Sequence, residues 1–345
     1  MEGKTINSYL KTGISSVKGI AIISVICAHC GSVQAENVIV KESVQLLSIL
    51  GGIGVLVFFT VSGMLFHYDK YSIKEFFIKK VFYLIVPWFI SGTAVYLYVY
   101  LRKPPIGFVS WINYIIGNGS YLYYMTVLLL FYLLFFFVKP LRSRVSLIIC
   151  EAVTLVSILF FYDKIFISPY LNVFNWIGFF ALGINIKENK KTFVKIFEFI
   201  KRFSGTVLLL YAVFVIYLLI FTNTGGYWGI LSAPACIFGA LCLAIIADFI
   251  AKKQWRTDFF CTIGDNSLFM YLWHMPIAGI VSKVMNIGFL SYGVIFRPVI
   301  VLAIMLLGLC IAQKVFAGNK ALSLMFSVRF KTKKDLMFKA ERICR

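Results

Sequence analysis

Negative charge and long polar stretches are both scarce in this chain. Only 14% of its 345 residues are charged, and 34 Lys and Arg outnumber 14 Asp and Glu. Soluble globular domains carry roughly 25% charged residues, so the composition excludes that class. No polar stretch approaches the ~50 residues that a separate soluble domain needs. Because 61% of the residues are hydrophobic, we expect one all-α membrane domain.

Histidine is scarcer still, which limits the chemistry open to the chain. The three histidines are His29, His67 and His274, and Cys27 and Cys30 flank the first of them. That cluster suggests a metal site, but a zinc site needs about four ligands of this kind. Most of the eight cysteines lie inside apolar segments, where free cysteine behaves as a small hydrophobe. We therefore expect no metal site.

Apolar runs long enough to cross a bilayer, about 20 residues each, recur along the chain. They predict a polytopic transmembrane helical bundle of about ten helices, covering residues 1–320. The remaining residues, 321–345, mix Leu, Met and Phe with Lys and Arg, which is typical of a basic amphipathic tail on the membrane surface. The expected helices lie near residues 13–32, 45–67, 81–101, 121–138, 145–162, 170–186, 203–221, 229–250, 261–282 and 292–315.

The distribution of positive charge predicts the orientation of the bundle. If the N-terminus is cytoplasmic, 27 of the 34 Lys and Arg fall in inner segments and 6 in outer ones. Positive charge gathers on the cytoplasmic side of membrane proteins, so we expect both termini there. The net charge of +20 comes from short clusters between apolar segments, which excludes a domain-sized nucleic-acid surface. An alternative for the N-terminus is a signal peptide cleaved after residues 33–35 (VQA).

Ionisable residues inside apolar segments are costly in a bilayer and are candidates for function. Lys18 and His29 lie eleven residues apart on one expected helix, so they share a face about 16 Å apart along the axis. His274 falls at a similar depth to His29. The two histidines either line one cavity or form polar links between helices. The candidates are Lys18, His29, Glu151, Asp248, Asp265, His274 and Arg297.

Five short motifs occur in order along the chain. A basic residue, Lys18, precedes His29 by ten intervening residues, and residues 54–63 read GVLVFFTVSG. Lys79 and Lys80 end a basic turn that leads to Pro87. Residues 122–125 read LYYM, and IGDNSL at 263–268 is followed by YLWHMP at 271–276. Together these motifs resemble the acyltransferase-3 family of integral membrane O-acyltransferases.

Three positions depart from the family pattern. Ser15 stands where the family often has Asp, three residues before the first basic residue. Leu84 replaces a common second Arg before the proline, and Tyr121 replaces a common His. These differences bear on the architecture of the donor site.

The resemblance implies transfer of an acyl group, usually acetyl, from cytoplasmic acyl-CoA to a hydroxyl of an extracytoplasmic surface glycan or its lipid-linked precursor. Acetyl-CoA is then a substrate, no bound cofactor is implied, and the location is the bacterial cytoplasmic membrane, among its lipids. His29 is expected to act as general base or as transient acyl carrier, and His274 to orient it or stabilise charge.

The resemblance also implies roles for the basic residues and the motif positions. Lys79 and Lys80 would hold the phosphates of acyl-CoA, or else serve only as cytoplasmic anchors. Lys18 would neutralise donor charge and assist catalysis, or else snorkel to the interface. The supporting motif positions are Ser62, Gly63, Ser267 and Tyr271.

A transporter or flippase of a lipid-linked glycan or small solute is the alternative function. About ten helices, charge inside the membrane and an outer aromatic loop at 225–228 (GGYW) fit that class as well. The acceptor sugar and the oligomeric state are left open by the sequence.

Overall fold

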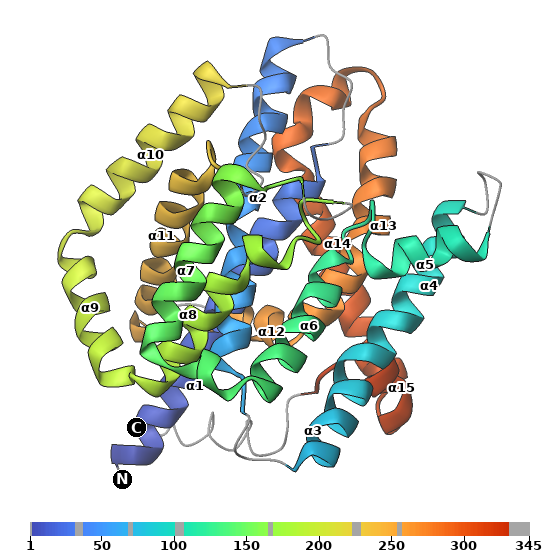
Figure 1. Cartoon of the computed structure of the whole chain (residues 1–345). Coiled ribbons are helices and arrows are strands. Elements are labelled where there is room, and N and C mark those ends of the chain that lie inside the picture. The colour runs from blue at the N-terminus through green and yellow to red at the C-terminus, as the bar shows by residue number, and fades with distance from the viewer. Residues whose placement is uncertain are drawn as a thin grey trace.

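The computed structural model describes residues 2–31, 37–67, 72–100, 107–164, 168–222, 229–253 and 257–330. Within these ranges the regular structure is entirely helical (Figure 1). Seven of the described helices are long and apolar enough to cross a membrane. The predicted all-α membrane bundle is therefore confirmed. The location of the two termini stays a prediction.

Each of the ten expected segments contains a helix. The segments expected at 121–138, 145–162 and 170–186 hold helices of 15, 17 and 12 residues, which are not among the seven long enough to cross a membrane. The elements are α1 Glu2–His29, α2 Val38–Met64, α3 Ile73–Lys80, η1 Val81–Ile85, α4 Val86–Tyr100, α5 Phe108–Ile116, α6 Tyr123–Phe137, η2 Lys139–Arg142, α7 Arg144–Phe160, η3 Val173–Asn175, α8 Ile177–Glu188, α9 Lys190–Arg202, α10 Ser204–Phe221, α11 Ala233–Lys253, α12 Thr257–Asp265, α13 Ser267–Met285, η4 Gly288–Phe296, α14 Arg297–Val315 and α15 Lys320–Met325.

Helix α1 is the central helix of the bundle. It contacts α2, α11, α12, α13 and α14, and its residues Ala21, Ile22 and Ile26 are fully buried. A Cβ at Gly54 of α2 would collide with the carbonyl of Ala21, and one at Gly264 of α12 with the carbonyl of Ser15. Small residues at such crossings let membrane helices pack backbone to backbone, so α1 is held on two sides.

A π-helical turn, η1, interrupts the long segment from Ile73 to Tyr100. Its cause is Pro87, which has no N–H to offer the carbonyl four residues earlier. The N–H of Val86 bonds instead to the carbonyl of Val81, five residues back. Such π-turns are frequent at functional sites, and this one directly follows Lys79 and Lys80.

A second proline, Pro276, lies inside α13. It removes the N–H that would pair with the carbonyl of Leu272. The hydroxyl of Tyr121, from the turn before α6, donates to that carbonyl at 2.7 Å. In return, the hydroxyl of Tyr271 donates to the carbonyl of Tyr121. These two hydrogen bonds therefore connect the start of α6 to the middle of α13, at the turn that the proline leaves open.

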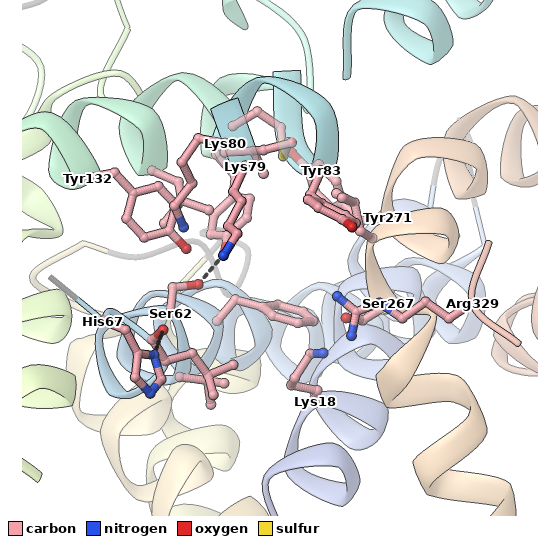
Figure 2. Close-up of a pocket in the computed structure, with 18 of the residues that line it drawn as sticks. Lys18, Ser62, His67, Lys79, Lys80, Tyr83, Tyr132, Ser267, Tyr271 and Arg329 are labelled. Atoms are coloured by element: carbon pink, nitrogen blue, oxygen red, sulfur yellow. Dashed lines mark hydrogen bonds between the residues drawn. The ribbon is translucent and has the colours of Figure 1, made fainter. Parts of the chain in front are cut away.

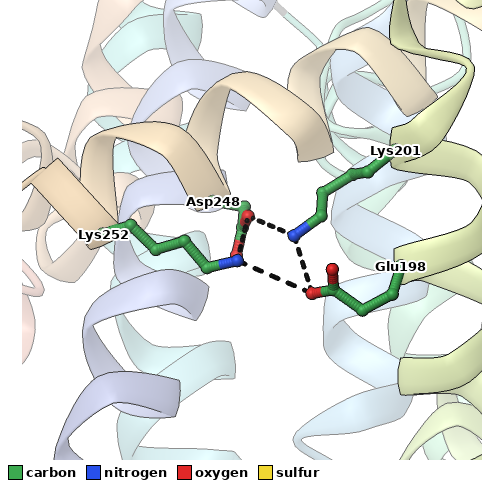
Figure 3. Close-up of polar contacts among 4 residues, drawn as sticks. All are labelled: Glu198, Lys201, Asp248 and Lys252. Atoms are coloured by element: carbon green, nitrogen blue, oxygen red, sulfur yellow. Dashed lines mark hydrogen bonds and ion pairs between the residues drawn. The ribbon is translucent and has the colours of Figure 1, made fainter.

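A cluster of four charged side chains joins the amphipathic helix α9 to α11 (Figure 3). Lys201 lies 2.6 Å from Glu198 and 2.9 Å from Asp248, and Lys252 lies 3.1 Å from Asp248. The hydrogen bond from Lys201 lowers the pKa of the Glu198 carboxyl. The cluster holds α9 against the end of the bundle where α1 begins.

The C-terminal residues as far as 330 pack onto the bundle. Helix α15 crosses the expected domain boundary at residue 320 and contacts α4 and η1. The ring of Phe326 stacks on Phe316 and on Trp273, with centroids 5.2 and 6.1 Å apart. The first part of the expected tail is therefore packed against the helices, and residues 331–345 lie outside the described residues.

Candidate active site

A cavity of about 340 Å³ opens at the end of the bundle where α1 begins. Helices α1, α2, α3, α6 and α13 contribute to its walls, together with the turn η1 and the segment after α15 (Figure 2). Its polar lining residues are Lys18, Ser62, His67, Lys79, Lys80, Tyr83, Tyr124, Tyr132, Ser267, Tyr271 and Arg329.

The cavity is strongly basic. Lys18, Lys79, Lys80 and Arg329 line it, and none of its described lining residues is Asp or Glu. Figure 2 shows Lys79 and Lys80 on one side of the cavity, with Lys18 and Arg329 on the other. The ammonium of Lys80 lies 3.3 Å from the centroid of the Tyr132 ring, an attractive cation–π contact. An anionic ligand is the natural occupant of such a site, because it would offset the repulsion among these cations.

Motif residues on α2, α6 and α13 form part of the cavity wall. Ser62 and Tyr124 share a hydrogen bond of 3.0 Å between their hydroxyls, and Ser267 and Tyr271 lie on α13. All four line the cavity. Gly63, by contrast, faces α8, where a Cβ would collide with the carbonyl of Phe180. Its role is helix packing.

His29 and His274 meet in the interior, although they come from opposite ends of the sequence. Their ring centroids are 5.0 Å apart, with the ring planes at 49°. His274 is fully buried, whereas His29 is half-buried. The ring of His29 thus packs against a buried ring on α13.

The hydrogen bonding of His274 indicates its tautomer. Its Nδ1 lies 2.6 Å from the carbonyl of Tyr271, and a carbonyl can only accept, so Nδ1 carries the proton. Its Nε2 is buried and has no hydrogen-bond partner among the described residues. In the neutral ring this nitrogen is an acceptor, which leaves a base available in the interior.

Tyr271 connects the two parts of the site. Its side chain lines the basic cavity, and its ring lies 5.8 Å from the ring of His274. His29 and His274 themselves do not line the cavity. Lys18 and His29 lie on one face of α1, about 16 Å apart along the axis, so the cavity and the histidine pair are successive regions along that helix.

Arg297 lies next to the histidine pair and is fully buried. Its Nη2 donates to Oδ1 of Asn286 at 2.6 Å, and its Nη1 reaches the carbonyl of Cys30 at 3.5 Å. A cation near the carbonyls that end a helix is stabilising. Arg297 thereby fixes the end of α1 that carries His29.

A model of an acyltransferase domain matches residues 11–313 of the chain. This match spans the motifs, the histidine pair and most of the cavity. The chain belongs to the acyltransferase-3 family. Together with the helices long enough to cross a membrane, this membership makes it a membrane acyltransferase. No curated protein and no solved structure matches the chain.

Two departures from the pattern of the acyltransferase-3 family have counterparts in the structure. Ser15 donates its hydroxyl proton to Asp265 of α12 at 2.6 Å, so another helix supplies a carboxylate next to this position. Tyr121, in place of the family's His, packs its ring 5.2 Å from that of His274. Leu84, in place of an Arg, lines the cavity.

The structure brings together most of the residues expected from the sequence and separates a few. Asp248 lies in the charged cluster on α9 and α11, and Glu151 lies on α7 near Gly178, away from the cavity. No group of three potential metal ligands occurs among the described residues.

The sequence analysis missed Arg329, His67 and the aromatic rings of Tyr83 and Tyr132 as lining residues. Tyr83 could have been found, since it follows the basic turn directly, whereas Tyr132 lies on α6, far from that turn in the sequence. Arg329 carried no such signal, because it lies in the segment expected to be a tail.

Proposed function

We propose that this membrane acyltransferase is an O-acyltransferase that moves an acyl group, acetyl in the simplest case, from cytoplasmic acyl-CoA to a hydroxyl of an extracytoplasmic glycan. A surface polysaccharide or its lipid-linked precursor is the acceptor class we favour. The bacterial cytoplasmic membrane is the expected location.

One observation carries this proposal: a basic cavity and a buried histidine pair lie in succession along one fixed helix. The cavity has four cationic lining residues and no described carboxylate, which suits the phosphates of coenzyme A. The histidines, with ring centroids 5.0 Å apart, are groups that can take a proton from a hydroxyl and pass it on.

The reaction follows from the roles of these groups. The acceptor hydroxyl attacks the thioester carbonyl carbon while a histidine nitrogen takes the hydroxyl proton. The C–S bond breaks, a C–O bond forms, and the proton passes to the departing thiolate, giving an ester and free coenzyme A. If His29 first carries the acyl group, the same bonds break and form in two steps.

The residues divide the work by position. The half-buried His29 faces the reacting atoms, and His274, with Nδ1–H committed to the carbonyl of Tyr271, orients His29 or accepts its proton through Nε2. Lys18, Lys79 and Lys80 hold the phosphates. The hydrogen bond between Ser62 and Tyr124 keeps the wall of the cavity rigid.

The test is acyl transfer by purified protein in lipid vesicles, supplied with labelled acetyl-CoA and a glycan acceptor. Wild type should move label to the acceptor or release free coenzyme A, and His29→Ala should abolish both while keeping its thermal stability. The control is Cys310→Ala, at an exposed position on α14, which should match wild type. Normal acylation by His29→Ala would remove His29 from the mechanism. Glycan passage across vesicles without coenzyme A release would favour the transporter alternative.

A further inference from the structure

The segment after α15 places a cation in the basic cavity from outside the family domain. Arg329 lines the cavity, whereas the match to the acyltransferase domain ends at residue 313. Figure 2 shows the Arg329 side chain directed toward Lys18, with Ser267 close by. The family membership therefore says nothing about Arg329.

The backbone at Arg329 is held by hydrogen bonds on both sides. Its N–H donates to Oδ1 of Asn266 at 2.8 Å, and its carbonyl accepts from Nε2 of Gln313 at 2.7 Å. Asn266 is 3% exposed and lies between α12 and α13, beside Ser267. Buried amides are retained where their hydrogen bonds are satisfied, so Asn266 is a specific anchor for this segment.

Further contacts fix the segment on the bundle before it reaches the cavity. Val328 is buried, and its N–H donates to the carbonyl of Ser323 at 2.8 Å. Ser327 adopts a left-handed conformation, with φ of 56°, a turn that non-glycine residues rarely make. With Phe326 stacked on α13 and α14 through Trp273 and Phe316, the segment is a strap across these helices. We call residues 326–330 the C-terminal strap.

The distribution of charge around the cavity indicates a role for the C-terminal strap in binding an anion. Arg329 and Lys18 form one cationic side, and Lys79 and Lys80 form the other. The nearby carboxylate of Asp265 accepts a hydrogen bond from Ser15 and does not line the cavity. Placing a second cation beside Lys18 is favourable when a multiply charged anion occupies the space between them.

We infer that Arg329 binds a phosphate group of the acyl-CoA donor, so that the C-terminal strap forms one wall of the donor site. This inference rests on the proposed function. A guanidinium offers a planar pair of donors that matches two phosphate oxygens, whereas Lys18 offers a point charge. Arg329 touches only the donor's phosphates, so it contributes to donor affinity and leaves the acyl-transfer step unchanged.

The experiment compares Arg329→Gln with wild type in steady-state coenzyme A release, using two donors. With acetyl-CoA, the variant should raise KM about tenfold at nearly constant kcat, a loss of about 1.4 kcal/mol in donor binding. With S-acetylpantetheine, which carries no phosphate, the two proteins should be indistinguishable. The KM of Arg329→Lys for acetyl-CoA should fall between the values of wild type and Arg329→Gln. Lysine keeps the positive charge but loses the paired donors of the guanidinium.

The matched control is Lys320→Gln, which removes one positive charge from an exposed position on α15 and should behave as wild type. An unchanged KM for acetyl-CoA in Arg329→Gln would overturn the inference. An equal loss with both donors would overturn it too, because that pattern belongs to a structural defect. Wild type that never turns over acetyl-CoA would instead refute the proposed function itself.

Discussion

Tyr121→Phe removes a hydroxyl that donates to the carbonyl of Leu272 at 2.7 Å. Pro276 has already taken away the helical N–H for that carbonyl. Leaving a buried acceptor unpaired costs about 1–3 kcal/mol, while side-chain hydrogen bonds in membrane proteins average about 0.6 kcal/mol and reach about 1.7 kcal/mol. Because the proline removes the helical donor, we expect a loss near the overlap of these ranges, about 1–1.5 kcal/mol.

A double-mutant cycle isolates this hydrogen bond. Pro276→Ala restores a backbone N–H that can pair with Leu272, so Tyr121→Phe on that background should cost less than about 0.5 kcal/mol. The coupling energy of the cycle is then about 1 kcal/mol. The measurement is reversible unfolding of the four purified proteins in detergent micelles, with acyl transfer measured on the same samples. Tyr121→Phe should also lower kcat, because the lost hydrogen bond to Leu272 positions the part of α13 that carries His274.

Strict additivity in this cycle would refute the reasoning. It would mean that the Leu272 carbonyl does not depend on Tyr121 in the folded protein, or that the helix closes around the proline in another way. A loss of activity with unchanged stability would instead assign Tyr121 to His274 alone.

Three further predictions follow from the same structure. His274→Gln keeps hydrogen bonding but removes a titrating nitrogen, so it should lower kcat at least a hundredfold with little change in the KM for the donor. A rate of acyl transfer equal to that of wild type would exclude a role of His274 in proton transfer. Lys18→Leu should raise the KM for acetyl-CoA about tenfold, as expected for one lost charge-assisted contact, and unchanged turnover at limiting donor would assign Lys18 to the interface. Asp248→Asn should lower stability by up to about 1 kcal/mol at low salt and by less in 1 M salt, measured by thermal unfolding, and a salt-independent effect would show that packing, not charge, links α9 to α11.

Helical spacing alone predicted that Lys18 and His29 share one face, because a long apolar helix has a regular period. The structure places Lys18 in the cavity and brings the His29 ring to 5.0 Å from His274. That second contact depended on helix packing, which the sequence showed only through the similar depth of the two histidines. The all-α membrane class was predictable from hydropathy for the same reason.

Other features required tertiary contacts that no local pattern carries. The carboxylate partner of Ser15 comes from Asp265, 250 residues away. Arg329 enters the cavity because Asn266 and Gln313 hold its backbone, yet its sequence surroundings are those of a basic tail. The shorter helices α6, α7 and α8 also differ from the expected spans; for example, the turn at 162–164 and η3 separate α7 from α8.

The two parts of the proposed site lie at different depths, and α1 determines how they can cooperate. Close packing at Gly54 and Gly264 clamps this helix between α2 and α12, and Arg297 binds beyond its His29 end. A helix held in this way is unsuited to carrying the acyl group by moving along its axis. If acyl-CoA is the donor, as proposed, it must then span the distance of about 16 Å between Lys18 and His29, with its phosphates in the cavity and its thioester past Tyr271. The rigidity of α1 therefore favours a long, flexible donor such as acyl-CoA over a compact one.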